Sequence, residues 1–431
     1  MTAEIAILNR QAVAMAADSA ATSFPGGSQK ISSYANKLFA LSNFAPVGIL
    51  IHGNANFITI PWETIIKEYR NFLGNRTYEV LEGYAEDFCS FVSSTISEHI
   101  DEKEQLAYAL HLIEGVFNEI KSIAHQRLSK EQGKIEDIIV EIIDFYHSRA
   151  KSASLNENRP KCFESRLKCK IGKDIKLRCR EIFDSCSISE EYINKLDYIA
   201  IKVIDCRTEE IITNTVNHTS GIAIAGFGMN DIFPVIQQFT TDGLIFDKIT
   251  VYEKETERFG LAAGALMVPF AQSDMVNLFM EGVAREYGSF LAETMYTHLQ
   301  ENISNVIRLI GPHIDEDTDT DKLVKEMMGQ LPTVVDSFMS ELNGLSKTKF
   351  SDPIMNVVAT LPKEQLAEMA EALVSLTALK RRVSDQEETV GGPIDVAIIT
   401  KGDGLIWIKR KHYFSPELNP SYFARNHARR F

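Results

Sequence analysis

The sequence is poor in cysteine, tryptophan and basic residues. Its 431 residues include six cysteines, two tryptophans, and 45 lysines and arginines against 59 acids. So few scattered cysteines exclude a disulfide framework and favour a reducing, cytoplasmic setting. The net charge of −14 argues against a surface built to bind nucleic acid.

The longest uncharged stretch, between Lys37 and Glu63, is interrupted by polar residues, and the first residues lack a basic region and a long apolar run. We therefore expect neither a membrane span nor a signal peptide.

Short apolar runs predict strands at the start, in the middle and at the end of the chain. Residues 4–9 and 12–17 are apolar on both faces, which is typical of strands buried between two layers. Further strands are expected at residues 37–41, 47–51, 198–205, 221–226, 233–240, 244–252, 261–270, 393–400 and 405–409.

Helical patterns fill the segments between these strands. Asp101 and Glu104 have the spacing of a capping box before an apolar helical face. Helices are expected within residues 61–195 and over 274–309, 322–342 and 363–382. The order strands, helices, strands, helices, strands predicts an α+β fold, a four-layer αββα sandwich with large helical insertions. We expect the core to comprise residues 1–60, 197–290 and 385–431, with helical insertions at 61–196 and 291–384.

The first residues carry a candidate catalytic group. If Met1 is removed, Thr2 supplies a hydroxyl nucleophile and a free amine that can act as its base. A lysine ammonium at ~4 Å would interact with that amine by ~4 kcal/mol at an effective dielectric of ~20, enough to lower the pKa of the amine by more than one unit. Such a lysine needs a carboxylate partner, and the sequence offers Lys37 and Asp18.

The residues around this set resemble the amino-terminal part of proteasome β-type subunits, which are N-terminal nucleophile (Ntn) hydrolases. Asp18 ends an alanine-rich strand and Lys37 begins a later one, as the acid and lysine do in that family. GGPIDV at residues 391–396 is similar to the family's Gly-Gly-x-Ile-Asp-Val segment. The similar segments are residues 2–60, 219–290 and 385–410. The resemblance implies an Ntn-hydrolase-like sandwich.

Carried over residue by residue, the resemblance implies that Thr2 is the nucleophile, Lys37 the lysine beside it and Asp18 the partner of that lysine. It places Thr22 and Ala20 in the substrate-binding strand, where Ala20 replaces a basic residue. Catalysis in the family requires no cofactor and no metal, so we expect neither.

Other positions match the family less closely. Ser273 falls near the serine beside the nucleophile's amine, and Glu387 or Asp385 corresponds to a supporting acid. Val390 stands where the family has a serine, and residues 50–51 stand where a glycine amide forms the oxyanion hole. These departures leave the fold better supported than the activity.

Three functions therefore remain open. The first is a proteasome-like threonine peptidase, acting on peptide or protein substrates as a homo-oligomer, with a regulatory ATPase or another partner protein. The second is a catalytically inactive relative that serves as an assembly or interaction platform. The third is an amidase for small molecules.

Two further features of the sequence, a group of four cysteines and a basic stretch, are interpreted as structural and not as functional sites. Four cysteines are spaced six, nine and six residues apart, unlike the close pairs of common zinc sites: Cys162, Cys169, Cys179 and Cys186. The basic stretch 151–180 is typical of a solvated helix face, so nucleic-acid recognition is not the favoured interpretation.

Overall fold

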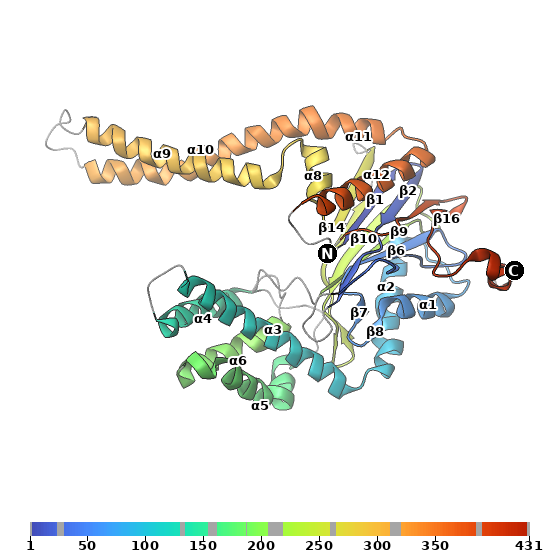
Figure 1. The fold of residues 1–431 in the computed structure, drawn as a ribbon, viewed down its shortest axis with the longest axis horizontal. Coiled ribbons are helices and arrows are strands. Elements are labelled where there is room, and N and C mark those ends of the chain that lie inside the picture. The colour runs from blue at the N-terminus through green and yellow to red at the C-terminus, as the bar shows by residue number, and fades with distance from the viewer. Residues whose placement is uncertain are drawn as a thin grey trace.

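The computed structural model describes residues 2–23, 30–129, 134–153, 162–186, 188–205, 219–258, 264–310, 320–384 and 390–428. Two five-stranded antiparallel sheets form its centre (Figure 1). The first sheet has the order β14 (Ala265–Ala271), β1 (Ala3–Asn9), β2 (Ala12–Ala17), β15 (Asp395–Thr400) and β16 (Gly404–Lys409). The second has the order β13 (Tyr252–Arg258), β10 (Val235–Thr241), β9 (Ser220–Gly226), β6 (Val47–Gly53) and β5 (Leu38–Ala40).

Strands β1 and β2 form the tight hairpin expected from their apolar runs, and every residue of both strands is buried. Their side chains alternate between two apolar layers, as the pleat of a strand requires. Ile5 and Ile7 pack toward helices, while Ala6 and Leu8 face the second sheet. A strand that is covered on both faces needs apolar residues at consecutive positions, which explains the continuous run in the sequence.

Helices cover the outer faces of both sheets. Helices α11 (Asp352–Val358) and α12 (Lys363–Arg382) pack on the first sheet. Helices α1 (Trp62–Leu73) and α2 (Leu81–Phe91) pack on the second. The expected mixture of helices with antiparallel sheets is therefore confirmed. Short two-stranded ladders lie outside these two sheets; they include β3 (Ala21–Ser23) with β4 (Lys30–Ser32), and β7 (Asn56–Phe57) with β8 (Ile60–Pro61).

Four helices form a separate bundle beside the second sheet: α3 (Glu102–Leu128), α4 (Ile135–Ser152), α5 (Phe163–Phe183) and α6 (Glu190–Asp205). The predicted capping box is present, since Asp101 accepts from the amide of Glu104 and Glu104 accepts from that of Asp101. The bundle buries its own apolar core, and Phe246 joins that core from the sheet side.

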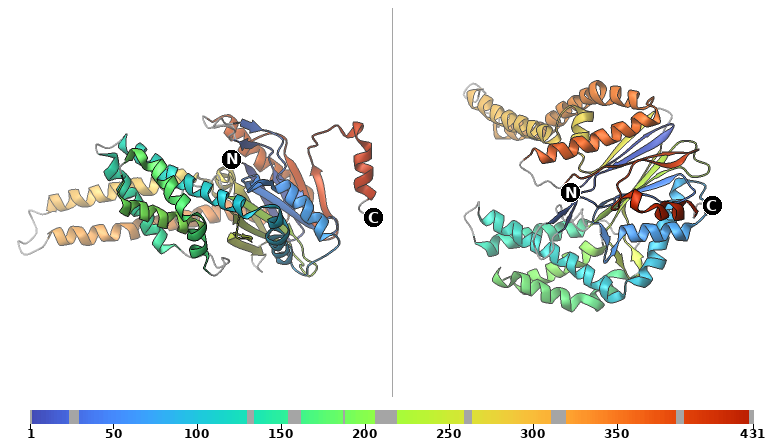
Figure 2. Two further views of the ribbon diagram at one scale, coloured as in Figure 1. Left: turned by 90° about the horizontal axis from the view of Figure 1, so that it is seen from below. Right: turned by 45° about the vertical axis from the view of Figure 1, so that its right-hand side comes forward.

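A second helical region is a long hairpin of α9 (Arg285–Ile310) and α10 (Thr320–Ser346), which follows the short α8 (Asp274–Glu281). The hairpin projects well beyond the sheets in Figure 1. In that view and in the right-hand view of Figure 2, the N-terminus lies between the hairpin and the α3–α6 bundle. The last described element is α13 (Pro420–Ala428), beside β16 in Figure 1.

Three expected elements differ from the structure. Residues 198–205, predicted as a strand, belong to α6, because the buried residues of the longer segment from Glu190 repeat at helical spacing. The predicted strand 244–252 is divided into β11 (Leu244–Ile245), β12 (Lys248–Ile249) and the start of β13. A turn with positive φ at Phe246 and Asp247 separates β11 from β12. The predicted helix 274–309 is interrupted at Gly282, whose φ of +73° ends α8.

The predicted domain boundaries stay predictions. Within the described part of the chain, no helix combines the length and apolarity needed to cross a membrane.

Candidate functional site

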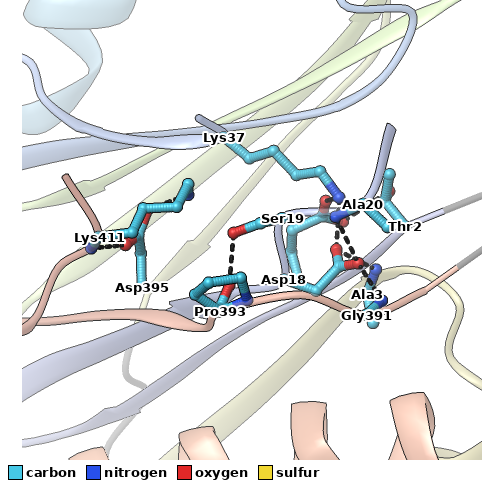
Figure 3. A network of polar contacts seen from close by, with 11 residues as sticks. Thr2, Ala3, Asp18, Ser19, Ala20, Lys37, Gly391, Pro393, Asp395 and Lys411 are labelled. Carbon is cyan, nitrogen blue, oxygen red and sulfur yellow. Dashed lines mark hydrogen bonds and ion pairs between the residues drawn. The ribbon is translucent and has the colours of Figure 1, made fainter. Parts of the chain in front are cut away.

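The structure brings Thr2, Asp18 and Lys37 together at the edge where the two sheets meet (Figure 3). Thr2 directly precedes β1, Asp18 directly follows β2, and Lys37 directly precedes β5 of the other sheet. The Lys37 ammonium donates to Asp18 Oδ1 across the gap between the sheets. Thr2, Asp18 and Lys37 are 7%, 0% and 6% exposed, so this contact is shielded from water.

Asp18 is held by backbone amides from three segments of the chain. Its Oδ1 accepts from the amide of Ala3 at 3.1 Å, and its Oδ2 accepts from those of Ala20 at 3.2 Å and Gly391 at 2.9 Å. Lys37 is the fourth donor. A buried carboxylate with this many donors is fixed in place, and it fixes the lysine in turn.

Glu4 joins the cluster, although it was not predicted from the sequence as a site residue. Its Oε2 accepts from the Thr2 hydroxyl at 3.0 Å, and its Oε1 lies 3.5 Å from Lys37 Nζ. The side chain is fully buried, and Oε1 accepts no hydrogen bond. Burial raises the pKa of Glu4 to about 7; the nearby Asp18 charge adds to the rise, while Lys37 opposes it. Glu4 is the one charged residue in a run that was expected to be a strand buried on both faces, and a charge at such a position could have identified it as a candidate functional residue.

The charges of the cluster differ from those the sequence suggested. Lys37 faces two carboxylates, Asp18 and Glu4. With both acids ionised the three side chains carry one net negative charge, so Lys37 is not a free cation beside Thr2. A negative surrounding favours the protonated form of an amine, which opposes the lowering of the amine's pKa that Lys37 was expected to cause.

Two predicted substrate-binding residues lie close to the cluster in the chain. Ala20 is buried, and its amide is committed to Asp18. Thr22 pairs with Ile31 in the β3–β4 ladder, and its side chain lies outside the described residues.

Ser273 follows β14 as the residue that precedes α8. The preceding residue, Gln272, donates its amide to Thr2 O at 3.0 Å, which brings this segment beside Thr2. The Ser273 hydroxyl, however, accepts from Asn277 Nδ2 within α8 at 3.1 Å. Glu387 and its alternative Asp385 lie outside the described residues.

The backbone expected to form the oxyanion hole is engaged elsewhere. The amide of Ile51 donates to Lys37 O at 2.9 Å, and Leu50 pairs with Ala223 across the β6–β9 ladder. Val390, which replaces a serine of the family, is fully buried among the apolar residues under α12.

A polar cavity of about 390 Å³ opens beside this segment. It is lined mainly by charged and amide side chains, among them Gln272, Ser273, Asp274, Asn277, Lys380 and Arg381. Arg381 donates to the Gln272 side chain, and Asp274 lies 2.9 Å from Lys380. The hydrogen bond from Gln272 to Thr2 therefore connects the cavity to the cluster.

No metal-binding set emerges from the part of the chain that is described: no three histidine, cysteine or acidic side chains there are grouped to hold an ion. Cys179 and Cys186 are buried, and Cys162 and Cys169 are exposed. The expected absence of a metal and of a cofactor stays a prediction.

Comparison with known proteins gives no family. No protein-family model matches the chain, and no curated protein sequence does. Solved structures that are similar to it include two Anbu proteins. Anbu (ancestral beta-subunit) from Yersinia bercovieri has 9% identity and a TM-score of 0.26, covering 99% of this chain and 95% of that one. The Anbu (Gly-1) mutant from Hyphomicrobium sp. strain MC1 has 9% identity and a TM-score of 0.25, covering 99% and 96%. Similarity at this level supports a distant relation at most.

The identification with proteasome β-type subunits and the Ntn hydrolase family was therefore wrong as drawn from the sequence. The segments that carried it are short, and each has a structural explanation of its own. The alanines of β2 are packed between two layers. Gly392 has a φ of +78°, and a Cβ there would lie 2.7 Å from Ser33 O. Buried strands and tight turns require such residues in unrelated folds as well.

Proposed function

We propose that the protein hydrolyses amide bonds, with Thr2 Oγ1 as the nucleophile and a peptide or protein as the substrate. One observation carries the proposal: the Thr2 hydroxyl donates to a buried carboxylate inside a cluster that also holds the Lys37–Asp18 ion pair. A hydroxyl becomes an effective nucleophile when a base is in hydrogen-bond contact with it. Buried ionisable groups with displaced pKa values are typical of such sites.

In this proposal Thr2 Oγ1 attacks the substrate carbonyl carbon and loses its proton to a neighbouring base. The free α-amine that Met1 removal would create is one acceptor, and Glu4 is the other group in contact. Asp18 orients Lys37, and Lys37 holds the carboxylate of Glu4 in reach.

The arrangement of the fold agrees with this proposal. The stacking of helices, first sheet, second sheet and helices supports an αββα sandwich in which the start of β1 reaches the edge between the sheets. We further propose that the protein acts in the cytoplasm as a homo-oligomer. The hairpin α9–α10 exposes large apolar side chains, including Tyr287, Phe290 and Leu309, on which contacts between subunits can form.

The test combines intact mass with covalent labelling. Protein without Met1 is expected to gain one adduct from a peptide β-lactone or epoxyketone, and Thr2→Ala is expected to gain none. Thr360→Ala, which removes an exposed threonine after α11, is the matched control and should label normally. Labelling that persists in Thr2→Ala, or its absence in the wild-type protein, would contradict the proposal.

A second function is favoured by the burial of Thr2, whose exposed fraction is 7%. A nucleophile this enclosed suits an assembly or interaction platform without catalysis. That alternative predicts a chain that keeps Met1, gains no adduct and still forms defined oligomers in solution. Labelling of Thr2 without cleavage of a broad peptide library would instead indicate an amidase for small molecules.

A further inference from the structure

Glu4 occupies a position from which it cannot turn away from Thr2. Its backbone lies inside the first sheet, paired with Ala17 on one side and Phe270 on the other. Residues two apart in a strand point to the same face, so Glu4 and Thr2 both face the space between the sheets. One carboxylate oxygen accepts from Thr2 Oγ1 at 3.0 Å, and the other is buried without a hydrogen bond.

The two groups able to take the Thr2 proton are not equivalent in this setting. A free Thr2 amine would lie beside a cluster with two acids and one lysine, which favours the charged ammonium and leaves no lone pair for a base. Glu4 already contacts the hydroxyl proton and retains unused lone pairs. Asp18 has no comparable freedom, because four donors occupy it.

Resting on the function proposed above, we propose that Glu4 is the catalytic base that receives the Thr2 hydroxyl proton, so that activation of Thr2 does not require its α-amine. The proton moves from Oγ1 to Glu4 Oε2 while Oγ1 bonds to the carbonyl carbon and the π electrons pass to the carbonyl oxygen. When the C=O bond re-forms, the C–N bond breaks and the Glu4 proton leaves with the nitrogen.

The second half of the reaction uses the same carboxylate. Water attacks the Thr2 ester and gives a proton to Glu4 as its oxygen bonds to the carbonyl carbon. The ester bond then breaks, and Glu4 returns the proton to Oγ1. Lys37, 3.5 Å from Oε1, holds the carboxylate throughout and is not consumed.

The pH dependence follows from the groups that face Glu4. Lys37 and Asp18 are its charged neighbours, and the ion pair of Asp395 and Lys411 lies two strands away in the same sheet. His52 stands near Lys37; burial, with a smaller contribution from Lys37, lowers its pKa to about 4, so it is neutral at physiological pH. With a Glu4 pKa of about 7, the rate of Thr2 acylation should rise roughly tenfold between pH 6 and pH 8.

The experiment measures the rate at which a peptide β-lactone acylates Thr2 in the full chain. Glu4→Gln keeps the shape of the side chain and removes the base, so acylation should slow by roughly 10²–10⁴-fold and lose its rise with pH. Asp395→Asn is the matched control: it disturbs another buried ion pair without touching Thr2 and should acylate at close to the wild-type rate. Thermal unfolding monitors the folding of both variants.

A second measurement separates the two bases directly. Wild-type protein that keeps Met1 can be made while methionine aminopeptidase is inhibited, and it has Glu4 but no free Thr2 amine. We expect this protein to be acylated still. If Glu4→Gln does not fold, this measurement alone decides whether the α-amine is required as the base. A loss of less than tenfold in Glu4→Gln, or an inert Met1-bearing chain, would overturn the role of Glu4. Acylation that survives in Thr2→Ala would instead show that the proposed nucleophile is wrong.

Discussion

Two buried lysine–aspartate pairs lie on either side of the same residue of β2. Ala17 pairs with Glu4 of β1, beside the Lys37–Asp18 pair, and with Asp395 of β15. Asp395 binds Lys411 through one oxygen and accepts the Lys411 amide at 2.8 Å through the other. That second site is balanced: one cation meets one acid, and both carboxylate oxygens are occupied.

The first site has the same lysine–aspartate pair with an additional acid and a hydroxyl. The additional acid, Glu4, has one oxygen without a hydrogen bond and a pKa raised by burial, whereas both carboxylate oxygens of Asp395 accept hydrogen bonds. A satisfied buried ion pair fixes local structure, whereas an unsatisfied acid beside a hydroxyl can exchange a proton. The comparison therefore separates a balanced ion pair from an unbalanced one, and the function proposed above makes only the unbalanced pair reactive.

Removing each lysine should give the largest difference. Lys37→Met leaves two buried acids without a cation, and loss of one partner of a buried pair typically lowers the free energy of unfolding by about 3–5 kcal/mol. Lys411→Met leaves only Asp395, which keeps its backbone donor, so its loss should be smaller. Urea unfolding at pH 7.5 measures both; equal losses would remove the distinction between the sites.

The stability of the protein should depend on pH through Glu4. Its pKa of about 7 in the folded state exceeds the ordinary value of 4.5, so the folded chain binds this proton more tightly than the unfolded chain. The resulting stabilisation is complete below pH 4.5 and is lost as the pH rises through 7, a change of about 3 kcal/mol. Unfolding free energies of wild type and Glu4→Gln, compared from pH 4.5 to 8, should diverge by that amount. A constant difference across this range would refute the coupling.

Neutralising Asp18 and neutralising Asp395 should have different effects on Thr2 acylation. The Asp18 charge contributes to the raised pKa of Glu4, so Asp18→Asn should shift the pH midpoint of Thr2 acylation downward by about one unit. Asp395→Asn should leave the midpoint near 7, because Asp395 is paired with its own lysine. The pH profiles of β-lactone labelling measure both midpoints. Identical shifts would show that the two acids influence Glu4 equally.

The smallest change in the rate of Thr2 acylation is expected for a substitution of Ser273, which lies outside the cluster of Thr2, Glu4, Asp18 and Lys37. Its hydroxyl is bonded to Asn277 inside α8, so Ser273→Ala should slow Thr2 acylation less than about threefold. The same labelling assay measures the rate. A loss of a hundredfold or more would place Ser273 in direct contact with the reacting atoms and extend the cluster to α8.

The sequence predicted secondary structure correctly where a pattern within a short segment is enough to determine it. The runs 4–9 and 12–17 form strands because two apolar layers demand consecutive apolar residues. The run 198–205 was misread because eight apolar-rich residues fit a strand, while the helix becomes evident only over the whole of α6.

The site shows the same limit. The grouping of Thr2, Asp18 and Lys37 was expected from the groups that a threonine nucleophile requires and from the resemblance to proteasome β-type subunits, and the structure places them in one cluster. Glu4 was overlooked because it lies within a run interpreted as apolar, and its role depends on Lys37 of the opposite sheet. A pattern within one short segment of sequence cannot predict a contact between residues of two different sheets.

The amide of Gly391 that holds Asp18 comes from 373 residues further along the chain. At ~5–20 residues per second, a ribosome needs about 20–75 s to synthesise that interval. A nascent chain therefore spends most of its synthesis with the Asp18 carboxylate lacking this donor. The Asp18 contacts are therefore complete only after Gly391 has been made, so under the function proposed above the Thr2 hydroxyl would not be activated before that point.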